Sequence, residues 1–183
     1  MKIGIIVGSI RQGRLGEQIG RWVARAGGER AASGACEYVL IDLKDFDLPL
    51  YASEVLPAAA NKRYEDPRVQ EWSRVIDACD AFVFITPEYN RSVPGAMKNA
   101  VDCLGAEWRG KPLGFVGYSA SGGIRAVEHW RAIMANFECP MLRTQLALSI
   151  FDDVQDGVFT PGERQAASLD ALLGELERAA RAA

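Results

Sequence analysis

The chain has 183 residues, 49% hydrophobic and 25% charged, which is ordinary for a soluble globular protein and fits one domain over residues 1–183. A net charge of −3 and a pI of about 5.3 argue against a nucleic-acid binder. No apolar run approaches the ~20 residues that cross a bilayer. Because the N-terminus leads directly into a strand, we expect no signal peptide and a cytoplasmic protein.

Apolar, strand-like runs alternate with segments of helical periodicity along the chain. The runs predict strands over residues 2–7, 37–42, 81–86, 113–118 and 141–146 or slightly beyond. The periodic segments predict helices over residues 15–27, 67–78, from 95 onward and 123–137, and a polar loop covers residues 44–61. Strands joined by helices in this way predict a parallel sheet with helices on both faces.

The C-terminal part carries a turn signal and a helix signal. The acidic segment Asp152 to Gly157 lacks the spacing and the terminal glutamate of a calcium loop, so we expect an Asp-Gly turn. A last helix follows, and Thr160, Pro161 and Glu163 offer it a cap, an N1 proline and an N3 glutamate.

The glycine-rich segment Gly8 to Gly16 follows the first predicted strand, and a helix begins at Leu15. A strand, a small loop and a helix N-terminus in this order favour anion binding. The Ser9 hydroxyl and the loop N–H groups can donate to a phosphate, and Arg11 and Arg14 add positive charge. The spacing matches neither a P-loop, which needs Lys-Ser/Thr after the glycines, nor the G-x-G-x-x-G of a dinucleotide fold.

Two further loops follow strands in the same way. The loop from Thr86 to Gly95 contains two prolines, a tyrosine and an asparagine. Because ligands of open α/β sheets bind at the carboxyl ends of strands, a rigid loop with an aromatic residue there suits a flat heteroaromatic ligand. The loop from Tyr118 to Gly123 consists of small residues that let a backbone approach a ligand closely. Taken alone, it is equally consistent with a plain glycine-rich turn.

Three motifs carry a family resemblance: Gly8-Ser9-x-Arg11, Thr86-Pro87-Glu88-Tyr89-Asn90-x-Ser92-x-Pro94-Gly95-x-x-Lys98-Asn99-Ala100-x-Asp102, and Tyr118-Ser119-Ala120-Ser121-Gly122-Gly123. Together they closely resemble the NADPH-dependent FMN reductase family, over a stretch from Met1 to about Phe137. The resemblance implies a flavodoxin-like, three-layer α/β sandwich with a five-stranded parallel sheet in the order 2-1-3-4-5. It also implies bound FMN, with NADPH or NADH as the co-substrate.

The resemblance further implies a set of FMN-binding residues on the three loops. They are Ser9, Arg11, Leu15, Gly16 and Glu17 on the first, Pro87, Glu88, Tyr89 and Asn90 on the second, and Ser119, Gly122 and Gly123 on the third. Family members commonly carry a serine or asparagine near Gly16, so backbone N–H groups of Leu15, Gly16 and Glu17 would complete the phosphate cradle. We name no catalytic acid or base and no metal ligand, because hydride transfer to a flavin needs none.

Three classes of function compete. The first is a reductase that passes two electrons from NAD(P)H to quinones, free flavin, metal oxyanions or azo compounds. The second is a flavodoxin-type electron carrier, which would usually be more acidic and would lack the long Pro-Glu-Tyr-Asn loop. The third is a flavin-based redox sensor with slow turnover. We expect the reductase, working on small-molecule acceptors as a homodimer or homotetramer, with neither nucleic acid nor membrane as a partner.

Several single residues have competing interpretations. We expect Glu88 to tie down its loop or border the flavin rather than to form an acid–base pair with Asp102. Arg125 is either a surface charge or, as the resemblance implies, part of a contact between subunits. Trp108 and Trp130 are either core residues or interface anchors.

The cysteines and the histidine do not point to a reactive centre. The four cysteines, at positions 36, 79, 103 and 139, contain no C-x-x-C pair. This spacing favours buried, reduced thiols over a zinc site. His129 is the only histidine, and we expect a structural or surface role for it.

Overall fold

A computed structural model describes residues 1–31 and 36–183 of the chain. Within these residues, five parallel strands form one sheet in the order β2-β1-β3-β4-β5, which confirms the flavodoxin-like prediction. The strands are β1 (Lys2–Val7), β2 (Glu37–Asp42), β3 (Ala81–Pro87), β4 (Leu113–Ser119) and β5 (Met141–Ser149). The predicted strand positions are thus correct, with extensions of one to three residues at the ends of β3, β4 and β5.

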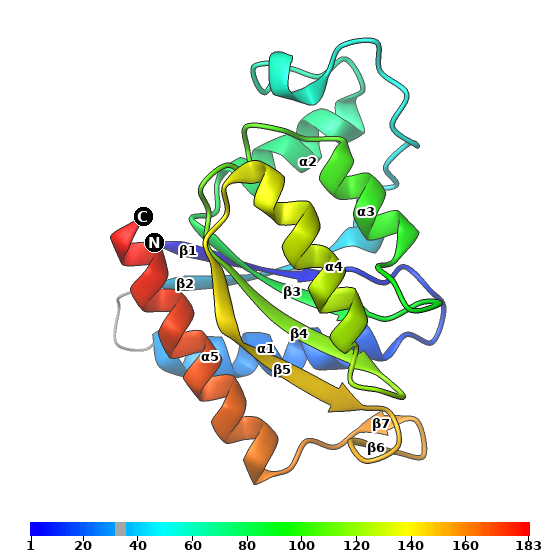
Figure 1. The fold of residues 1–183 in the computed structure, drawn as a ribbon, viewed down its shortest axis with the longest axis vertical. Helices are drawn as coiled ribbons and strands as arrows, with labels where there is room; N and C mark the ends of the chain where they lie inside the picture. Colours follow the sequence, from blue (N-terminus) through cyan, green and yellow to red (C-terminus); the bar gives the residue numbers. More distant parts are fainter. Residues whose placement is uncertain (32–35) are drawn as a thin grey trace.

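Helices cover both faces of the sheet (Figure 1), as predicted. The helices are α1 (Leu15–Ala31), α2 (Pro67–Asp77), α3 (Gly95–Asp102), α4 (Ile124–Met134) and α5 (Glu163–Ala182). Side chains of α1 and α5 pack into one core, and those of α2, α3 and α4 pack into the other. No helix of the described chain is long and apolar enough to span a membrane.

The core on the α2–α4 side is built from aromatic rings. The ring of Phe84 lies 5.4 Å from that of Trp130 and 6.0 Å from that of Trp108, both edge-on. Trp108 is 1% exposed and Trp130 is 0% exposed. Both tryptophans are therefore core residues, and the interpretation as interface anchors is wrong.

The start of the last helix differs from the prediction. The helix α5 begins at Glu163, with Gly162 as its N-cap and no capping side chain. Thr160 lies before this N-cap, and its N–H donates to the carbonyl of Asp153 at 2.9 Å. This bond ties the chain to a hairpin, β6 (Val154–Gln155) and β7 (Val158–Phe159), which the sequence did not suggest. The hairpin turns at Asp156 and Gly157, both with positive φ, so the predicted Asp-Gly turn is confirmed.

The long segment between β2 and α2 contains two single-turn 3₁₀ helices, Leu43–Asp45 and Pro57–Ala59, and is held down by polar side chains. The Asn99 amide of α3 donates to the Pro49 carbonyl and accepts from the Tyr51 N–H, both at 2.9 Å. These two bonds fix the middle of the segment to a helix that directly follows the second loop.

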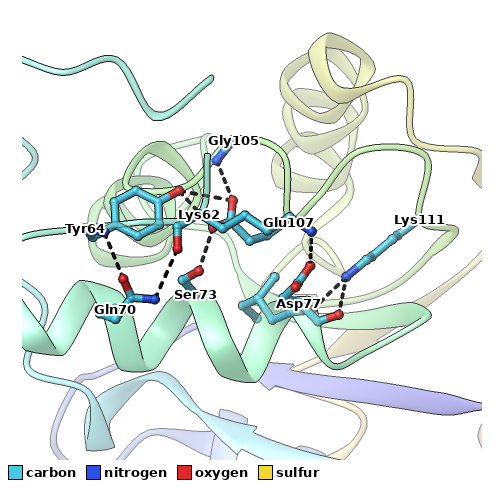
Figure 2. Close-up of polar contacts among 9 residues, drawn as sticks. Lys62, Tyr64, Gln70, Ser73, Asp77, Gly105, Glu107 and Lys111 are labelled. Carbon is cyan, nitrogen blue, oxygen red and sulfur yellow. Dashed lines mark hydrogen bonds and ion pairs between the residues drawn. The ribbon is translucent and has the colours of Figure 1, made fainter. Parts of the chain in front are cut away.

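A buried carboxylate fixes the end of the same segment (Figure 2). Glu107 is 0% exposed and accepts hydrogen bonds from the Tyr64 hydroxyl at 2.9 Å, the Ser73 hydroxyl at 2.6 Å and the Gly105 N–H at 3.0 Å. Gly105 also lies against Pro57, where an added Cβ would come within 2.8 Å of the backbone. Glu107 therefore ties the end of this segment and the helix α2 to the loop that follows α3.

Candidate functional site

The loops after β1, β3 and β4 surround a cavity of about 480 Å³ at the carboxyl edge of the sheet. We call it the carboxyl-edge cavity. Its lining residues are Arg11, Gly13, Arg14, Leu15, Pro87, Glu88, Tyr89, Asn90, Arg91, Tyr118, Ser119, Ala120, Ser121 and Ile150. The sheet order changes direction between β1 and β3, and this switch point is where open α/β sheets bind ligands. The volume is in the range of small-molecule and cofactor sites.

Ser9 connects the first loop to the second. Its side chain is 1% exposed, and its hydroxyl is hydrogen-bonded to the Tyr89 hydroxyl at 2.7 Å. The Arg11 N–H also donates to the Ser9 hydroxyl, at 3.3 Å. Ser9 therefore does not line the cavity, and in this structure its hydroxyl orients Tyr89, which does.

Arg14 is the buried cation of the first loop. Its side chain is only 6% exposed, whereas Arg11 is exposed. The Arg14 guanidinium forms an ion pair with Asp42 at the end of β2 and lies 3.7 Å from the Glu17 carboxylate. Its buried Nε has no hydrogen-bond partner among the described residues. The cavity wall therefore contains a fixed cation with one unused donor.

The second loop contains a hydrogen-bonded turn. Tyr89 and Ser92 exchange backbone hydrogen bonds, each 3.0 Å long. Between them, Asn90 and Arg91 have φ values of 49° and 66°, which gives a two-residue turn in the left-handed region. The turn holds Tyr89 and Asn90 at the cavity wall.

An ion pair between a buried carboxylate and a half-exposed arginine joins the second loop to the start of α4, which follows the third loop. The Glu88 side chain is 7% exposed and accepts from the Arg125 backbone N–H at 3.1 Å and from the Arg125 guanidinium at 2.5 Å. The guanidinium also donates to Ser121 at 2.6 Å. Glu88 thus ties down its loop, as expected, and Arg125 is more than a surface charge. Asp102 pairs instead with Lys98, at 2.6 Å, so the two carboxylates form no acid–base pair.

The third loop turns sharply through its glycines. Gly122 and Gly123 have φ values of 73° and 68°, and an added Cβ at Gly123 would come within 2.6 Å of the Tyr118 nitrogen. The Ser119 hydroxyl accepts from the Ser121 N–H at 3.0 Å and from the Gly123 N–H at 2.8 Å. The glycines are needed for this turn itself, and they do not line the cavity.

Tyr118 reaches from β4 beneath the first loop. It is 7% exposed, and its buried hydroxyl has no hydrogen-bond partner within the part of the chain that the structure describes. Burial raises the pKa of this hydroxyl, against the lowering effect of the nearby Ser9 hydroxyl and Gly16 N–H. A tyrosine hydroxyl is protonated at neutral pH, so its proton is available to donate. Tyr118 is a candidate site residue that the sequence analysis did not single out, although it opens the third motif.

The structure brings most of the predicted site residues together. Arg11, Leu15, Pro87, Glu88, Tyr89, Asn90 and Ser119 line the carboxyl-edge cavity. The structure does not place Ser9, Gly16, Glu17, Gly122 and Gly123 in that lining. The lining also includes Arg14 and Ile150. Ile150 directly follows β5, and the rule that ligands bind at carboxyl ends of strands would have found it.

The remaining chemistry-bearing side chains are engaged elsewhere or buried. His129 is exposed, and its Nδ1 is hydrogen-bonded to the Ser92 hydroxyl at 2.8 Å. Cys79, Cys103 and Cys139 are buried free thiols, as predicted. For Cys36 the prediction of burial is wrong, because this residue is partly exposed. Over residues 1–31 and 36–183, no group of three His, Cys, Asp or Glu side chains is close enough to hold a metal ion.

The sheet order and the cavity at its switch point are those of a flavodoxin-like protein. The chain belongs to the NADPH-dependent FMN reductase family, whose model matches residues 1–153. Over 140 residues it is 36% identical to the NAD(P)H-dependent FMN reductase LOT6 of Saccharomyces cerevisiae, covering 73% of each chain. Over 168 residues it is 36% identical to a quinone reductase of Pseudomonas putida, covering 82% of this chain and 81% of the relative.

A solved structure supports the same assignment. The flavoenzyme FerB of Paracoccus denitrificans, an NAD(P)H:(acceptor) oxidoreductase, superposes with a TM-score of 0.74 and 26% identity. The match covers 99% of this chain and 97% of FerB. The chain is therefore an oxidoreductase that depends on FMN and NAD(P)H.

Proposed function

We propose that the protein passes two electrons from NADPH or NADH to a quinone or a similar small acceptor, through FMN bound in the carboxyl-edge cavity. NAD(P)H is oxidised to NAD(P)⁺, and the quinone takes up two electrons and two protons, of which one comes from solvent. The observation that carries the proposal is the meeting of three motif loops around one cavity at the switch point. Similarity to a quinone reductase over 82% of the chain supports the choice of acceptor.

The donors of the cavity fit the two ends of FMN. At one end, the buried Arg14 Nε and Tyr118 hydroxyl, both unpaired in the described chain, suit a phosphate beside the start of α1. At the other end, Pro87, Tyr89 and Ser119–Ser121 suit a flat ring. Ser9 and the glycine pair support these contacts, because they hold Tyr89 and shape the third loop.

The residues around the cavity bind and orient rather than transfer protons. Bound FMN supplies the two-electron chemistry between nicotinamide and acceptor. The Glu88 carboxylate is occupied by Arg125, and His129 is hydrogen-bonded to Ser92, so neither is a free base at the cavity. Water therefore exchanges the protons, and access to the ring face sets the rate.

The protein is expected to act in the cytoplasm, as a single domain that assembles into a homodimer or homotetramer. Large apolar side chains on the segment between β2 and α2 support self-association: Leu50 is 84% exposed, Val55 53% and Leu56 67%. Sedimentation at micromolar concentration should give a species of at least twice the 20.0 kDa chain mass. A 20.0 kDa species alone would exclude the assembly.

Steady-state kinetics separate the reductase from the other two candidates. With FMN-loaded protein, NADPH and NADH oxidation should depend on benzoquinone and give parallel double-reciprocal lines, because both substrates use the same ring face in turn. An electron carrier or a redox sensor would oxidise either nucleotide only slowly. The Pro87–Asn90 segment of the second loop favours the reductase, since carriers lack this loop.

A further inference from the structure

We infer that the Tyr118 hydroxyl and the Arg14 Nε–H group together recognise the flavin phosphate, and that Asp42 positions Arg14 for this role. The inference rests on the proposed function, because it requires FMN in the carboxyl-edge cavity. It assigns phosphate selectivity to side chains of β4 and β2 as well as to the glycine-rich loop.

The first argument is the position of the Tyr118 hydroxyl relative to Gly16. An added Cβ at Gly16 would lie 2.7 Å from the Tyr118 hydroxyl oxygen but 3.4 Å from the ring carbon that carries it. Gly16 lies in the first turn of α1, where backbone N–H groups have no partner within the helix. The tyrosine hydroxyl therefore occupies the space that a side chain at position 16 would fill. It adds a donor to the helix N-terminus.

The second argument is that this donor and Arg14 Nε are both unsatisfied. Each atom is buried without a hydrogen-bond partner in the described residues, on side chains that are 7% and 6% exposed. A buried donor without a partner is destabilising. Two such donors on the wall of one cavity are explained by a ligand that accepts from both. A phosphate accepts from both through charged oxygens, whereas the end of riboflavin offers only a neutral hydroxyl, whose hydrogen bonds are weaker.

The third argument is the fixed geometry of Arg14. Asp42 is the last residue of β2 and lies beside Val7, the last residue of β1. Its second carboxylate oxygen accepts from the Lys44 N–H at 3.0 Å, so the carboxylate itself is oriented by the backbone. The ion pair occupies an Nη group of Arg14 and leaves Nε free. Asp42 thus acts as a positioning residue, and Glu17 is the other acidic group near Arg14.

Flavin affinities of the conservative variants Tyr118→Phe, Arg14→Lys and Asp42→Asn test the inference. Fluorescence quenching gives Kd for FMN and for riboflavin on flavin-free protein. Tyr118→Phe and Arg14→Lys should each raise the FMN Kd by roughly 10- to 150-fold, the range for a hydrogen bond to a charged group. The riboflavin Kd should change by less than about 2-fold in both variants.

Matched controls make the same chemical changes away from the cavity. Tyr51→Phe removes a hydroxyl from the segment between β2 and α2, and Arg25→Lys changes an exposed arginine of α1. Neither should alter the preference for FMN over riboflavin. Asp42→Asn should raise the FMN Kd less than Arg14→Lys does, because the arginine remains but is no longer held.

Substitutions at Gly16 provide an independent test by double-mutant analysis. Gly16→Ala should weaken FMN binding in the wild-type background, because its Cβ displaces the Tyr118 hydroxyl. In the Tyr118→Phe background the same change should have little further effect, since the nearest remaining contacts are 3.3 and 3.4 Å. Gly16→Ser combined with Tyr118→Phe should restore much of the FMN preference, because it returns a hydroxyl to the same space.

The outcomes distinguish this inference from the proposed function. Two results would overturn the inference and leave the proposed function standing. One is that the effects of Gly16→Ala and Tyr118→Phe are additive. The other is that the preference for FMN over riboflavin is unchanged in both Tyr118→Phe and Arg14→Lys. Absence of flavin binding by the wild-type protein would overturn the proposed function itself. The melting temperature of each flavin-free variant shows whether it is folded. If Tyr118→Phe does not fold, Arg14→Lys decides.

Discussion

Replacing Glu107 by alanine should destabilise the protein strongly, because three donors lose one acceptor. The Tyr64 hydroxyl, the Ser73 hydroxyl and the Gly105 N–H all converge on this fully buried carboxylate (Figure 2). A buried donor left unpaired costs roughly 1–3 kcal/mol. Because the Tyr64 hydroxyl can turn toward solvent, we count two donors and expect a loss of about 3–5 kcal/mol, or roughly 6–20 °C in Tm.

Glu107→Gln should be milder, at about 1–2 kcal/mol, since a glutamine amide can still accept from Gly105 while it donates to Ser73. Tyr64→Phe should cost about 1 kcal/mol, because the carboxylate keeps two donors. The assay is thermal and urea unfolding with excess FMN present throughout, so that flavin binding stabilises all variants alike. A Tm for Glu107→Ala within about 3 °C of wild type, or a larger loss for glutamine than for alanine, would refute the reasoning.

Two further predictions follow from the other buried groups. Glu88→Gln should weaken FMN binding by roughly 3- to 10-fold and change the kcat/KM for quinones in parallel. The reason is that the bond from the half-exposed Arg125 weakens, so the second loop is held less firmly. Unchanged FMN affinity together with altered acceptor use would contradict this prediction. Burial raises the pKa of Cys79, Cys103 and Cys139 from about 9 to about 11. The folded state keeps these thiols protonated while the unfolded chain ionises them. Their stability contribution is therefore complete below pH 9 and lost as pH rises through 11. Urea unfolding at pH 8 and pH 10.5 should show a decrease that is smaller in Cys103→Ala, and an equal decrease in that variant would argue against the assignment.

The sheet and the loops around the cavity follow from local sequence patterns. A continuous apolar run such as Ala81–Ile85 can form a buried central strand, and the runs of β1, β3 and β4 lead into glycine, proline or small residues that end them. The carboxyl ends of parallel strands meet at one edge, so three such loops are brought together by topology alone.

Contacts that depend on three-dimensional register could not be predicted. The Arg14–Asp42 ion pair exists because β1 and β2 align Val7 with Asp42, and no local pattern specifies that alignment. The space shared by Tyr118 and Gly16 depends on how α1 sits over β4.

Two other features of the structure were not predicted from the sequence, for a similar reason. The partners of Glu107 come from three segments, so a single glutamate in a loop gave no signal. The sequence around Thr160 is typical of a helix cap, but the N–H of Thr160 donates to the carbonyl of Asp153 beside the β6–β7 hairpin. The two strands of this hairpin are too short to show an alternating pattern in the sequence.

Anaerobic reduction of the bound flavin tests the central claim most directly. FMN-loaded protein is mixed with NADPH, and separately with NADH, while the visible absorbance band of the flavin is followed. We predict rapid bleaching with at least one nucleotide, and full recovery of the band when benzoquinone is added. A flavin that stays oxidised with both nucleotides, yet is bleached by dithionite, would contradict the account and indicate an electron carrier or a redox sensor instead.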